Sequence, residues 1–306
     1  MGQTPVAQRY TSPALGICSL CYDPRVAKKL PLLLILAALA PAGWSQSLTR
    51  GSVAARLPGG KPDFNGVWQA IGSAHYDVER HIARPAMMLR PGPYGPLPAI
   101  PVLRLGAVVS VPGGMGIVEG GTIPYKPEAA KKRDENREHW MERDPEVKCY
   151  MPGVPRANYM PYPFQIVQND RNFFIAYEYA GANRDVQFAK PVPAETDSWM
   201  GQSYGHWEGD TLVVEVVGQN DSTWFDRSGT HHSNELKVTE RYSLNGPNHI
   251  IYEATIEDPE VFTRPWKISM PLYRRMEPDA RLLDFRCVEF VEELMFGEFR
   301  RKPLPR

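Results

Sequence analysis

The loop between residues 218 and 235 carries many side chains that can transfer protons or bind polar atoms. Carboxylates, imidazoles, an indole and a hydroxyl occur there, at Asp221, Trp224, Asp226, His231, His232 and Ser233. Alternating apolar runs flank the loop on both sides, and loops that carry function are commonly held by rigid strands of this kind. The loop therefore predicts a site for acid–base chemistry or for binding a small molecule.

The hairpin that follows this loop places Glu240 on an apolar face. If Leu244 faces Asn248 across the turn, then Glu240 faces Tyr252, and one face of the hairpin is apolar while the other carries charges. Burial of a carboxylate is costly unless the group is paired or protonated, and it raises the pKa of a carboxyl group toward the range useful in catalysis. The alternative is that an inward arginine neutralises Glu240 and leaves it a structural role.

The candidate catalytic residues share an ability to give or take protons, and they are Glu240, His232, Asp226 and Tyr252. In this hypothesis Glu240 and His232 exchange protons with a substrate, Tyr252 donates a hydrogen bond, and Asp226 orients a histidine. The residues expected to contact the substrate are Trp224, His231, Tyr242, Asp258, Arg264 and Trp266. The structural alternatives are a fully bonded loop histidine and an Asp258–Arg264 pair across a turn.

The sequence predicts neither a metal nor a nucleotide cofactor. His231 and His232 are adjacent, so in a strand they point to opposite sides and cannot share one ion. No third ligand stands at a zinc spacing. Ser233 lacks the Gly-x-Ser-x-Gly elbow of a serine nucleophile. Gly113-Gly-Met-Gly116 is followed by more glycine and proline rather than by a helix, unlike a phosphate-binding loop.

The N-terminal region has the layout of a secretory signal. Basic residues precede the apolar run Leu30–Ala42, and small residues follow it, so we expect cleavage near Ser45 or Gln46. The run is short for a membrane span, and an uncleaved anchor is the alternative. We therefore expect residues 1–45 to be a signal region, with 1–25 an extension ahead of a start at Val26, and the protein to be periplasmic or secreted.

The rest of the chain predicts a mainly β fold. Residues 46–61 read as a linker, and 62–306 as one antiparallel, lipocalin-like barrel with a Pro/Gly-rich insertion over 84–124 and a short helix over 127–141. The expected strands cover 164–168, 173–179, 199–207, 211–217, 236–244, 248–258, 266–273 and 282–289. Cys149 and Cys287 either pair in an oxidising compartment or stay as buried thiols.

Several motifs together resemble a family of exported bacterial proteins that share a W-E-G-D-T-L-V-V core and have no assigned activity. They are Pro62–Trp68, Ile123–Tyr125, Pro127–Ala130, Cys149, Pro152–Arg156, Pro163–Gln168, Gly205–Val214, His232–Ser233, Glu240–Tyr242, Asp258–Pro259 and Pro265–Trp266. The resemblance covers most of the chain after Pro62. It implies export and a lipocalin-like barrel without supplying a reaction. It also implies that His232, which precedes Ser233, matters more than His231.

Three function classes fit these patterns. The first is an exported, cofactor-free lyase, isomerase or hydrolase that acts on a small apolar or aromatic molecule in the barrel. The second is a periplasmic carrier that binds such a molecule without catalysis, and the third is a structural domain. A formal net charge of zero gives no support to binding of nucleic acid or an acidic membrane. Glu240→Gln separates the first two classes, because it should abolish turnover and preserve affinity.

Overall fold

The computed structural model describes residues 54–83, 89–90, 97–98, 113–189, 191–192 and 195–291, which belong to the compact unit Gly51–Arg306. The predicted signal region, the first part of the predicted linker and much of the predicted insertion lie outside the described residues. Residues 54–61 of the linker form a turn, in which the Gly60 amide donates to the Leu57 carbonyl. Arg56 in this turn pairs with Asp210 at 2.5 Å.

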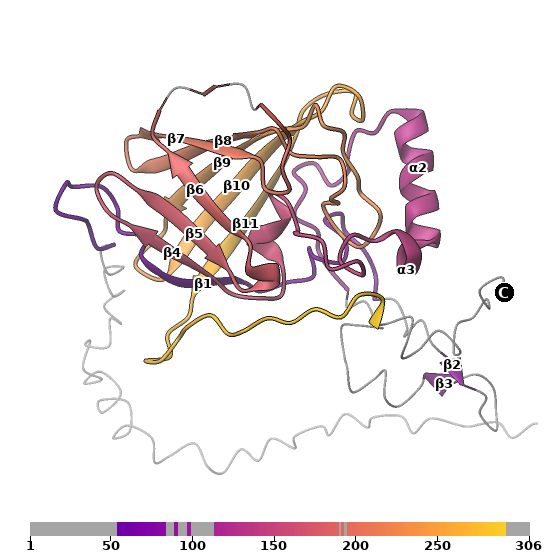
Figure 1. The fold of residues 1–306 in the computed structure, drawn as a ribbon, viewed down its shortest axis with the longest axis horizontal. Helices are drawn as coiled ribbons and strands as arrows, with labels where there is room; N and C mark the ends of the chain where they lie inside the picture. Colours follow the sequence, from indigo (N-terminus) through magenta and orange to yellow (C-terminus); the bar gives the residue numbers. More distant parts are fainter. Residues whose placement is uncertain are drawn as a thin grey trace, which may run out of the picture. The chain divides into compact units, whose positions relative to one another are not determined.

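Nine strands close into one mixed β-barrel, in the order β1, β11, β10, β9, β8, β7, β6, β5, β4 (Figure 1). The strands are β1 Gly66–Ala70, β4 Phe164–Gln168, β5 Phe173–Tyr177, β6 Asn183–Gln187, β7 Gln202–Glu208, β8 Thr211–Val217, β9 Lys237–Leu244, β10 His249–Glu257 and β11 Trp266–Arg274. Only the β6–β7 pair is parallel among these neighbours. The predicted mainly β class and lipocalin-like barrel are thus confirmed, with one parallel pair that was not predicted.

The remaining elements lie outside the strand order. They are α2 Pro127–Glu138, α3 Trp140–Arg143, the 3₁₀ turns η3 Arg156–Tyr159 and η4 Tyr179–Gly181, and a separate pair of short strands, β2 Leu89–Arg90 and β3 Leu97–Pro98. Pro127 opens α2 and an acidic residue occupies its first turn, as a helix N-terminus favours. The helix predicted over 127–141 is therefore confirmed to Glu138, where His139 leaves helical geometry.

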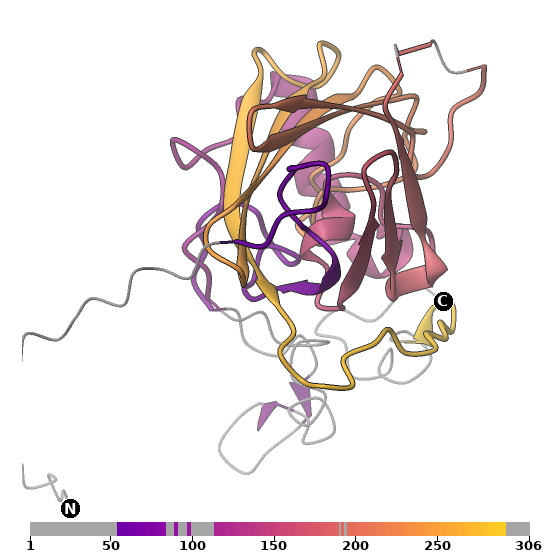
Figure 2. The ribbon, with the colours of Figure 1, turned by 90° about the vertical axis from the view of Figure 1, so that its left-hand side faces the viewer.

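Along β9 and β10 every second side chain is buried, because successive side chains of a strand point to opposite faces of the sheet. Figure 2 shows the strands curving around a common interior, and the side chains that point into it are buried. Trp68 of the first strand is fully buried, and its indole N–H donates to the Phe64 carbonyl at 2.8 Å. The Arg274 guanidinium lies over the Trp68 ring at 4.2 Å. All four residues of η3 are also buried.

The predicted register of the β9–β10 hairpin is wrong by two residues. Leu244 pairs with Ile250, so Glu240 pairs with Ala254, and Tyr252 pairs with Tyr242. The Asn245 amide donates to the His249 carbonyl across a longer turn than the one assumed. A shift of two preserves the alternation of faces, so the apolar pattern identifies the inward residues correctly without fixing their partners.

The strand predicted over 282–289 is absent, and β6 was not predicted. Residues 282–289 run without strand pairing, because β11 already bonds to β10 and β1 and the closed barrel offers no free edge. β6 has the polar sequence NRDVQ, in which only Arg184 and Val186 are buried. An inward arginine breaks the apolar alternation by which strands are recognised.

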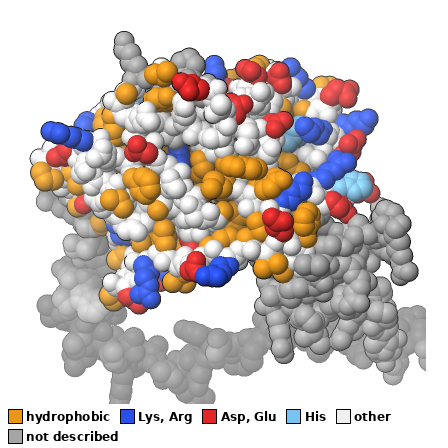
Figure 3. Space-filling model, viewed as in Figure 1, with side chains coloured by type: hydrophobic (Ala, Val, Ile, Leu, Met, Phe, Trp, Pro, Cys, Tyr) orange, Lys and Arg blue, Asp and Glu red, His pale blue; other side chains and the backbone are white. Residues whose placement is uncertain are grey.

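A disulfide joins Cys149 to Cys287, with 5.8 Å between their Cα atoms, which resolves the alternative left open by the sequence. The bridge closes a loop of 138 residues, worth on the order of 4–5 kcal/mol in the chain-entropy account. On the face drawn in Figure 3, basic and acidic side chains are interspersed among hydrophobic ones. Within the described part of the chain, no helix combines the length and the apolar character needed to cross a membrane.

Candidate functional site

Glu240 points into the barrel from β9 and is fully buried. Its Oε2 accepts a hydrogen bond from Arg184 Nη2 at 2.5 Å. Its Oε1 accepts from Asn158 Nδ2 at 2.9 Å, from the Tyr242 hydroxyl at 2.9 Å and from the Tyr252 hydroxyl at 2.7 Å. The inward carboxylate is therefore present, and it is held by an arginine, as the structural alternative required.

The groups around this carboxylate bond to one another as well. Arg184 Nε donates to Ser203 Oγ at 3.1 Å, and Arg184 Nη1 donates to the Tyr177 hydroxyl at 3.3 Å. The Tyr177 hydroxyl donates in turn to Asn158 Oδ1 at 2.8 Å. Burial, opposed by Arg184, raises the pKa of Tyr177 to about 12. The phenol stays protonated at neutral pH and can act as a donor, which stabilises the buried ion pair.

Burial also raises the pKa of Tyr242 and of Tyr252 well above the ordinary value, and the Glu240 charge adds to the effect. Among the described residues, the hydrogen bonds of Glu240 end on the barrel strands and on η3, and none reaches His232 or Asp226. The structure therefore brings Glu240, Tyr242 and Tyr252 together and does not join them to the other two candidate catalytic residues. Catalysis by Glu240 stays a prediction.

Asp226 anchors the loop that the sequence singled out. It is fully buried, and its Oδ1 accepts from the amides of Ser228 and Thr230 at 2.9 and 3.2 Å. Its Oδ2 accepts from the Val78 amide and from the Thr230 hydroxyl, both at 3.0 Å. Burial and the Asp77 charge raise its pKa to about 6 against these donors. Asp226 thus connects this loop to residues 75–78 and orients no histidine through its hydrogen bonds.

His232 has a partner at each ring nitrogen. Nε2 lies 2.7 Å from the Thr223 hydroxyl and Nδ1 lies 2.8 Å from the Ser233 carbonyl, so Nδ1 carries the proton and Nε2 accepts. Burial lowers its pKa, which keeps the ring neutral. Asp258 accepts from the Ser233 amide at 2.6 Å and from the Ser233 hydroxyl at 2.9 Å. These contacts match a fully bonded loop histidine.

The predicted substrate-contacting residues are dispersed. Trp224 and His231 are buried, and their backbones pair in an isolated antiparallel β-bridge. The Trp266 ring packs edge-on against the Phe225 ring, with 5.6 Å between the ring centroids. Arg264 is exposed and donates to the Pro265 carbonyl. The Asp258 carboxylate accepts hydrogen bonds from backbone amides and from the Ser233 hydroxyl. Among the described residues it forms no ion pair with Arg264. Tyr242 belongs to the Glu240 network, so these six residues form no single surface.

His231 should make folding stability depend on pH. Burial, with Lys132 adding to the effect, lowers its pKa to about 4 from an ordinary 6.5. As the pH falls from 6.5 toward 4, His231 therefore binds a proton in the unfolded chain but stays neutral in the folded chain. The folded state loses stability over this pH range. We expect His231→Gln to remove about 2 kcal/mol of the acid-induced loss between pH 7 and pH 4.5, at about 1.4 kcal/mol per pKa unit.

Urea unfolding of wild type and His231→Gln at both pH values measures the difference. The raised pKa of Asp226 acts in the opposite direction and is common to both proteins, so it cancels in the comparison. The exposed His206→Gln variant should follow the wild-type curve. Equal acid-induced losses in wild type and His231→Gln would show that this histidine does not titrate between the folded and unfolded states.

A second group of charged side chains surrounds His75, and no motif in the sequence connects its members. His75 Nε2 lies 2.9 Å from Glu146 Oε2, and Arg156 Nη2 donates to the same oxygen at 2.8 Å. Arg227 Nε donates to Asp144 Oδ2 at 3.1 Å and lies 3.7 Å from Glu146 Oε2. The His75 ring is therefore held by Glu146, whose carboxylate also contacts two arginines.

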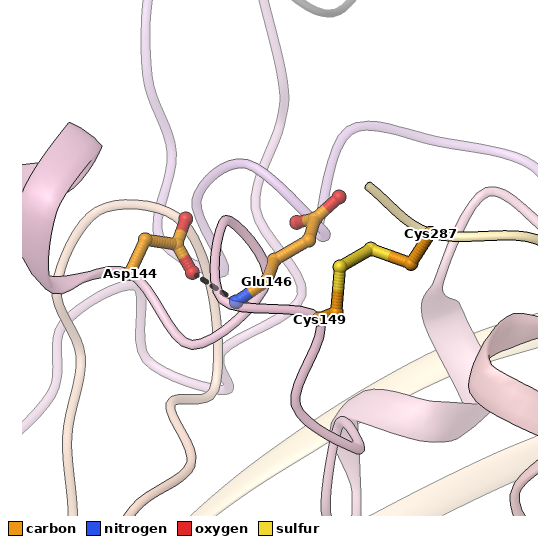
Figure 4. Close-up of a disulfide and its surroundings, with 4 residues drawn as sticks. All are labelled: Asp144, Glu146, Cys149 and Cys287. Carbon is orange, nitrogen blue, oxygen red and sulfur yellow. Dashed lines mark hydrogen bonds between the residues drawn. A yellow bond between two sulfur atoms is a disulfide. The ribbon is translucent and has the colours of Figure 1, made fainter. Parts of the chain in front are cut away.

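The loop at 226–230 helps to hold this group in place. The Arg227 amide donates to the His75 carbonyl at 3.1 Å, and the Ser228 hydroxyl donates to the Tyr76 carbonyl at 3.0 Å. On the other side, the Glu146 amide donates to Asp144 Oδ1 at 2.9 Å in the turn that leads to Cys149 (Figure 4). His75 and Glu146 therefore come from two loops that are each tied by several hydrogen bonds.

The protonation states in this group follow from burial and charge. Burial raises the pKa of Glu146, but His75, Arg227 and Arg156 together lower it by more than burial raises it. The pKa of Glu146 therefore lies well below its usual range. Burial lowers the pKa of His75, partly opposed by Glu146. A neutral His75 that donates Nε2–H to Glu146 leaves Nδ1 without a proton. This Nδ1 is buried and has no hydrogen-bond partner among the described residues.

A surface cavity of about 370 Å³ lies beside this histidine. Its walls are mostly aromatic or aliphatic, and thirteen residues line it: His75, Tyr76, Glu146, Val147, Pro161, Tyr162, Tyr179, Arg227, Phe285, Arg286, Cys287, Val288 and Val291. The Tyr179 hydroxyl is also buried without a partner in the described structure. The cavity therefore has mostly apolar walls, and two of its lining residues, His75 and Tyr179, each carry a buried polar atom without a described partner. Mostly apolar walls with a few polar groups are typical of small-molecule sites.

Two further cavities lack this combination. One, of about 560 Å³, lies between the end of β1 and residues 113–117, and glycine, alanine and methionine make up much of its lining. The other, of about 470 Å³, includes Asp258 and Arg264 together with charged residues of both signs. It is the one of the three that contains predicted site residues; the Asp258 carboxylate is bonded to Ser233, and Arg264 is exposed. None of the three cavities is lined by Glu240.

The sequence contained only a weak signal for the His75 site. His75 stands in Gly72-Ser-Ala-His-Tyr76, outside any motif, and Glu146 lies in the helix-ending run Asp144-Pro-Glu146. Contacts between residues 71 positions apart cannot be inferred from local patterns. Cys149 was the one sequence feature that indicated this region, because its disulfide with Cys287 holds the turn with Glu146 against the C-terminal segment.

Within the described residues, no group of three or more histidine, cysteine, aspartate or glutamate side chains could hold a metal ion. No family model, no curated protein and no solved structure matches the chain. The resemblance to exported bacterial proteins therefore stays a prediction.

Proposed function

We propose that the chain is an exported, cofactor-free acid–base enzyme that acts on a small aromatic molecule in the cavity beside His75, with His75 as the general base. The observation that carries the proposal is the His75 ring: Nε2 is fixed on Glu146 Oε2 at 2.9 Å, and Nδ1 is buried with no described partner. A neutral imidazole held by a carboxylate at one nitrogen is prepared to accept a proton at the other.

The proton transfers follow from this arrangement. His75 Nδ1 takes a proton from a bound water or from an acidic C–H of the substrate, and the imidazolium that forms is stabilised by the adjacent Glu146 carboxylate. The Tyr179 hydroxyl donates a hydrogen bond to the substrate oxygen on which negative charge develops. Burial raises the pKa of Tyr179 well above its ordinary value, so this hydroxyl keeps its proton at neutral pH.

The lining of the cavity favours proton transfer over covalent catalysis. It contains no serine, threonine or lysine, and its cysteine is joined in the disulfide. We propose a lyase, an isomerase or a hydrolase that activates water directly as the reaction class. Tyr162, Tyr179 and Phe285 supply rings against which a planar aromatic group can pack. A volume of about 370 Å³ limits the ligand to a small molecule.

Isotope incorporation tests the proposal without knowledge of the substrate. The protein is incubated in deuterium oxide or in heavy-oxygen water with aryl esters, aryl 3-hydroxycarboxylates and aryl ketones, and the products are read by mass spectrometry. We expect deuterium or heavy oxygen to enter one class at least 100-fold faster than without protein. Incorporation at the uncatalysed rate in every class, with phenol still binding the cavity, would indicate a carrier and contradict the enzyme.

A further inference from the structure

Residues 282–291, called here the C-terminal strap, form one wall of the cavity beside His75. They supply five of its thirteen lining residues, namely Phe285, Arg286, Cys287, Val288 and Val291. The strap follows β11 and belongs to no sheet, and Figure 1 shows it as an extended segment outside the barrel. The proposed site is therefore complete only when the strap is in place.

Among the described residues, few contacts other than the disulfide hold the strap. The Phe285 ring packs against Tyr179 at 4.7 Å and against Tyr162 at 5.1 Å. The Leu283 amide donates to Glu178 Oε2 and the Phe290 amide donates to the Val147 carbonyl, each at 2.8 Å. Most strap residues are exposed, including Leu283 at 62% and Val288 at 58%. Such sparse burial offsets little of the entropy lost on ordering the segment.

The disulfide connects the strap to the turn that carries Glu146. Figure 4 shows Glu146 and Cys149 on the same short turn, with Cys287 reaching it from the strap. Cys149 has a positive φ of 60°, which is unfavourable for a residue with a side chain and has to be held by its surroundings. Cys287 is exposed and Cys149 is half-buried, so a thiol in solution can approach the bridge from the strap side.

We propose that the Cys149–Cys287 disulfide is a thiol–disulfide exchange site, and that its reduction by a dithiol releases the strap and dismantles the cavity. One thiolate of the dithiol attacks the Cys287 sulfur and forms a mixed disulfide, while the electron pair of the broken bond stays on the Cys149 sulfur, which takes up a proton. The second thiolate then attacks the reductant's own sulfur and expels Cys287, which is protonated. Two electrons pass to the protein and the dithiol becomes a disulfide.

The role of the strap in turnover rests on the proposed function, but the release of the strap does not. We therefore pair two readouts: hydrogen exchange of the whole protein by mass spectrometry, and binding of phenol by ligand-observed NMR. Both are measured before and after treatment with dithiothreitol under native conditions, and again after reoxidation. A Cys149→Ser/Cys287→Ser variant has no bridge to reduce and controls for other effects of the reductant.

Reduction is expected to speed the exchange of strap amides at least tenfold and to leave the strands β4 and β9 unchanged. Phenol affinity should fall at least fivefold and recover on reoxidation, and the double-serine variant should behave as the reduced protein in both buffers. A strap that stays protected after complete reduction, confirmed by alkylation of both thiols, would overturn the inference. So would unchanged phenol affinity with an open strap, whereas absence of turnover in either redox state would count against the proposed function alone.

Discussion

Glu240→Gln is expected to lower the free energy of unfolding by about 3–5 kcal/mol, the usual cost of removing one partner of a buried ion pair. Arg184 and Glu240 are both buried, and their closest atoms lie 2.5 Å apart. A glutamine oxygen at the Oε1 position can still accept from Tyr242 and Tyr252. Its amide group would then face Arg184 Nη2, so two donors meet and the arginine charge has no counter-ion. Urea unfolding monitored by tryptophan fluorescence measures the loss.

The exposed pair between Glu208 and Arg241, at 2.8 Å, provides a matched control. Glu208→Gln removes the same charge and should cost less than about 1 kcal/mol, because water screens the remaining arginine. In the barrel, Arg184→Gln/Glu240→Gln should cost less than the sum of its two single variants, since neither charge is left alone. A Glu240→Gln protein as stable as the Glu208→Gln control would contradict the account of the barrel network.

The second large effect is expected on turnover. His75→Gln should reduce kcat/KM by about 10²–10⁴-fold, the contribution typical of a general base. The glutamine side-chain amide can take the place of Nε2–H and still donate to Glu146, so the loop geometry is preserved while the proton acceptor at Nδ1 is lost. Steady-state rates on the substrate class found by isotope incorporation measure the effect, and exposed His206→Gln is the control.

The dependence of rate on pH separates catalysis by His75 from a packing effect. Because burial lowers the pKa of His75, the base is neutral down to a pH below 6.5, and the acid limb of kcat/KM should lie below that value. The Glu146 charge raises the pKa of His75, so Glu146→Gln should move the acid limb to still lower pH. A limb that stays in place in Glu146→Gln, or a His75→Gln variant with the wild-type rate, would exclude His75 as the base.

The alternation of apolar and polar residues in the sequence was sufficient to predict the barrel and to predict that Glu240 points into it. It could not fix which residue Glu240 faces, because a slip of two along β9 and β10 keeps every side chain on its own face. The alternation also failed to predict β6, because Arg184 interrupts the apolar pattern and its charge is neutralised by Glu240 from another strand. Buried polar pairs of this kind are recognised once both partners are placed.

The candidate site was harder to predict for a related reason. The sequence drew attention to the loop with Asp226 and His232 because it is rich in titratable groups, and the structure assigns hydrogen bonds to both residues that tie the loop together. His75 and Glu146 are isolated in sequence and meet only because the barrel, the Asp226 loop and the disulfide bring their segments together. What distinguishes His75 is the combination of an unpartnered ring nitrogen, a carboxylate at the other ring nitrogen and a cavity beside the residue, which exists only in three dimensions.

The role of His75 is tested most directly by the nitrogen-15 NMR spectrum of its imidazole, assigned by comparison with His75→Gln and recorded with and without phenol. We expect a neutral ring at pH 7 with the proton on Nε2 and none on Nδ1, and an Nδ1 resonance that moves as phenol saturates the cavity. A ring protonated on Nδ1, or an imidazole spectrum unchanged by saturating phenol, would contradict the assignment of His75 as the base of this site.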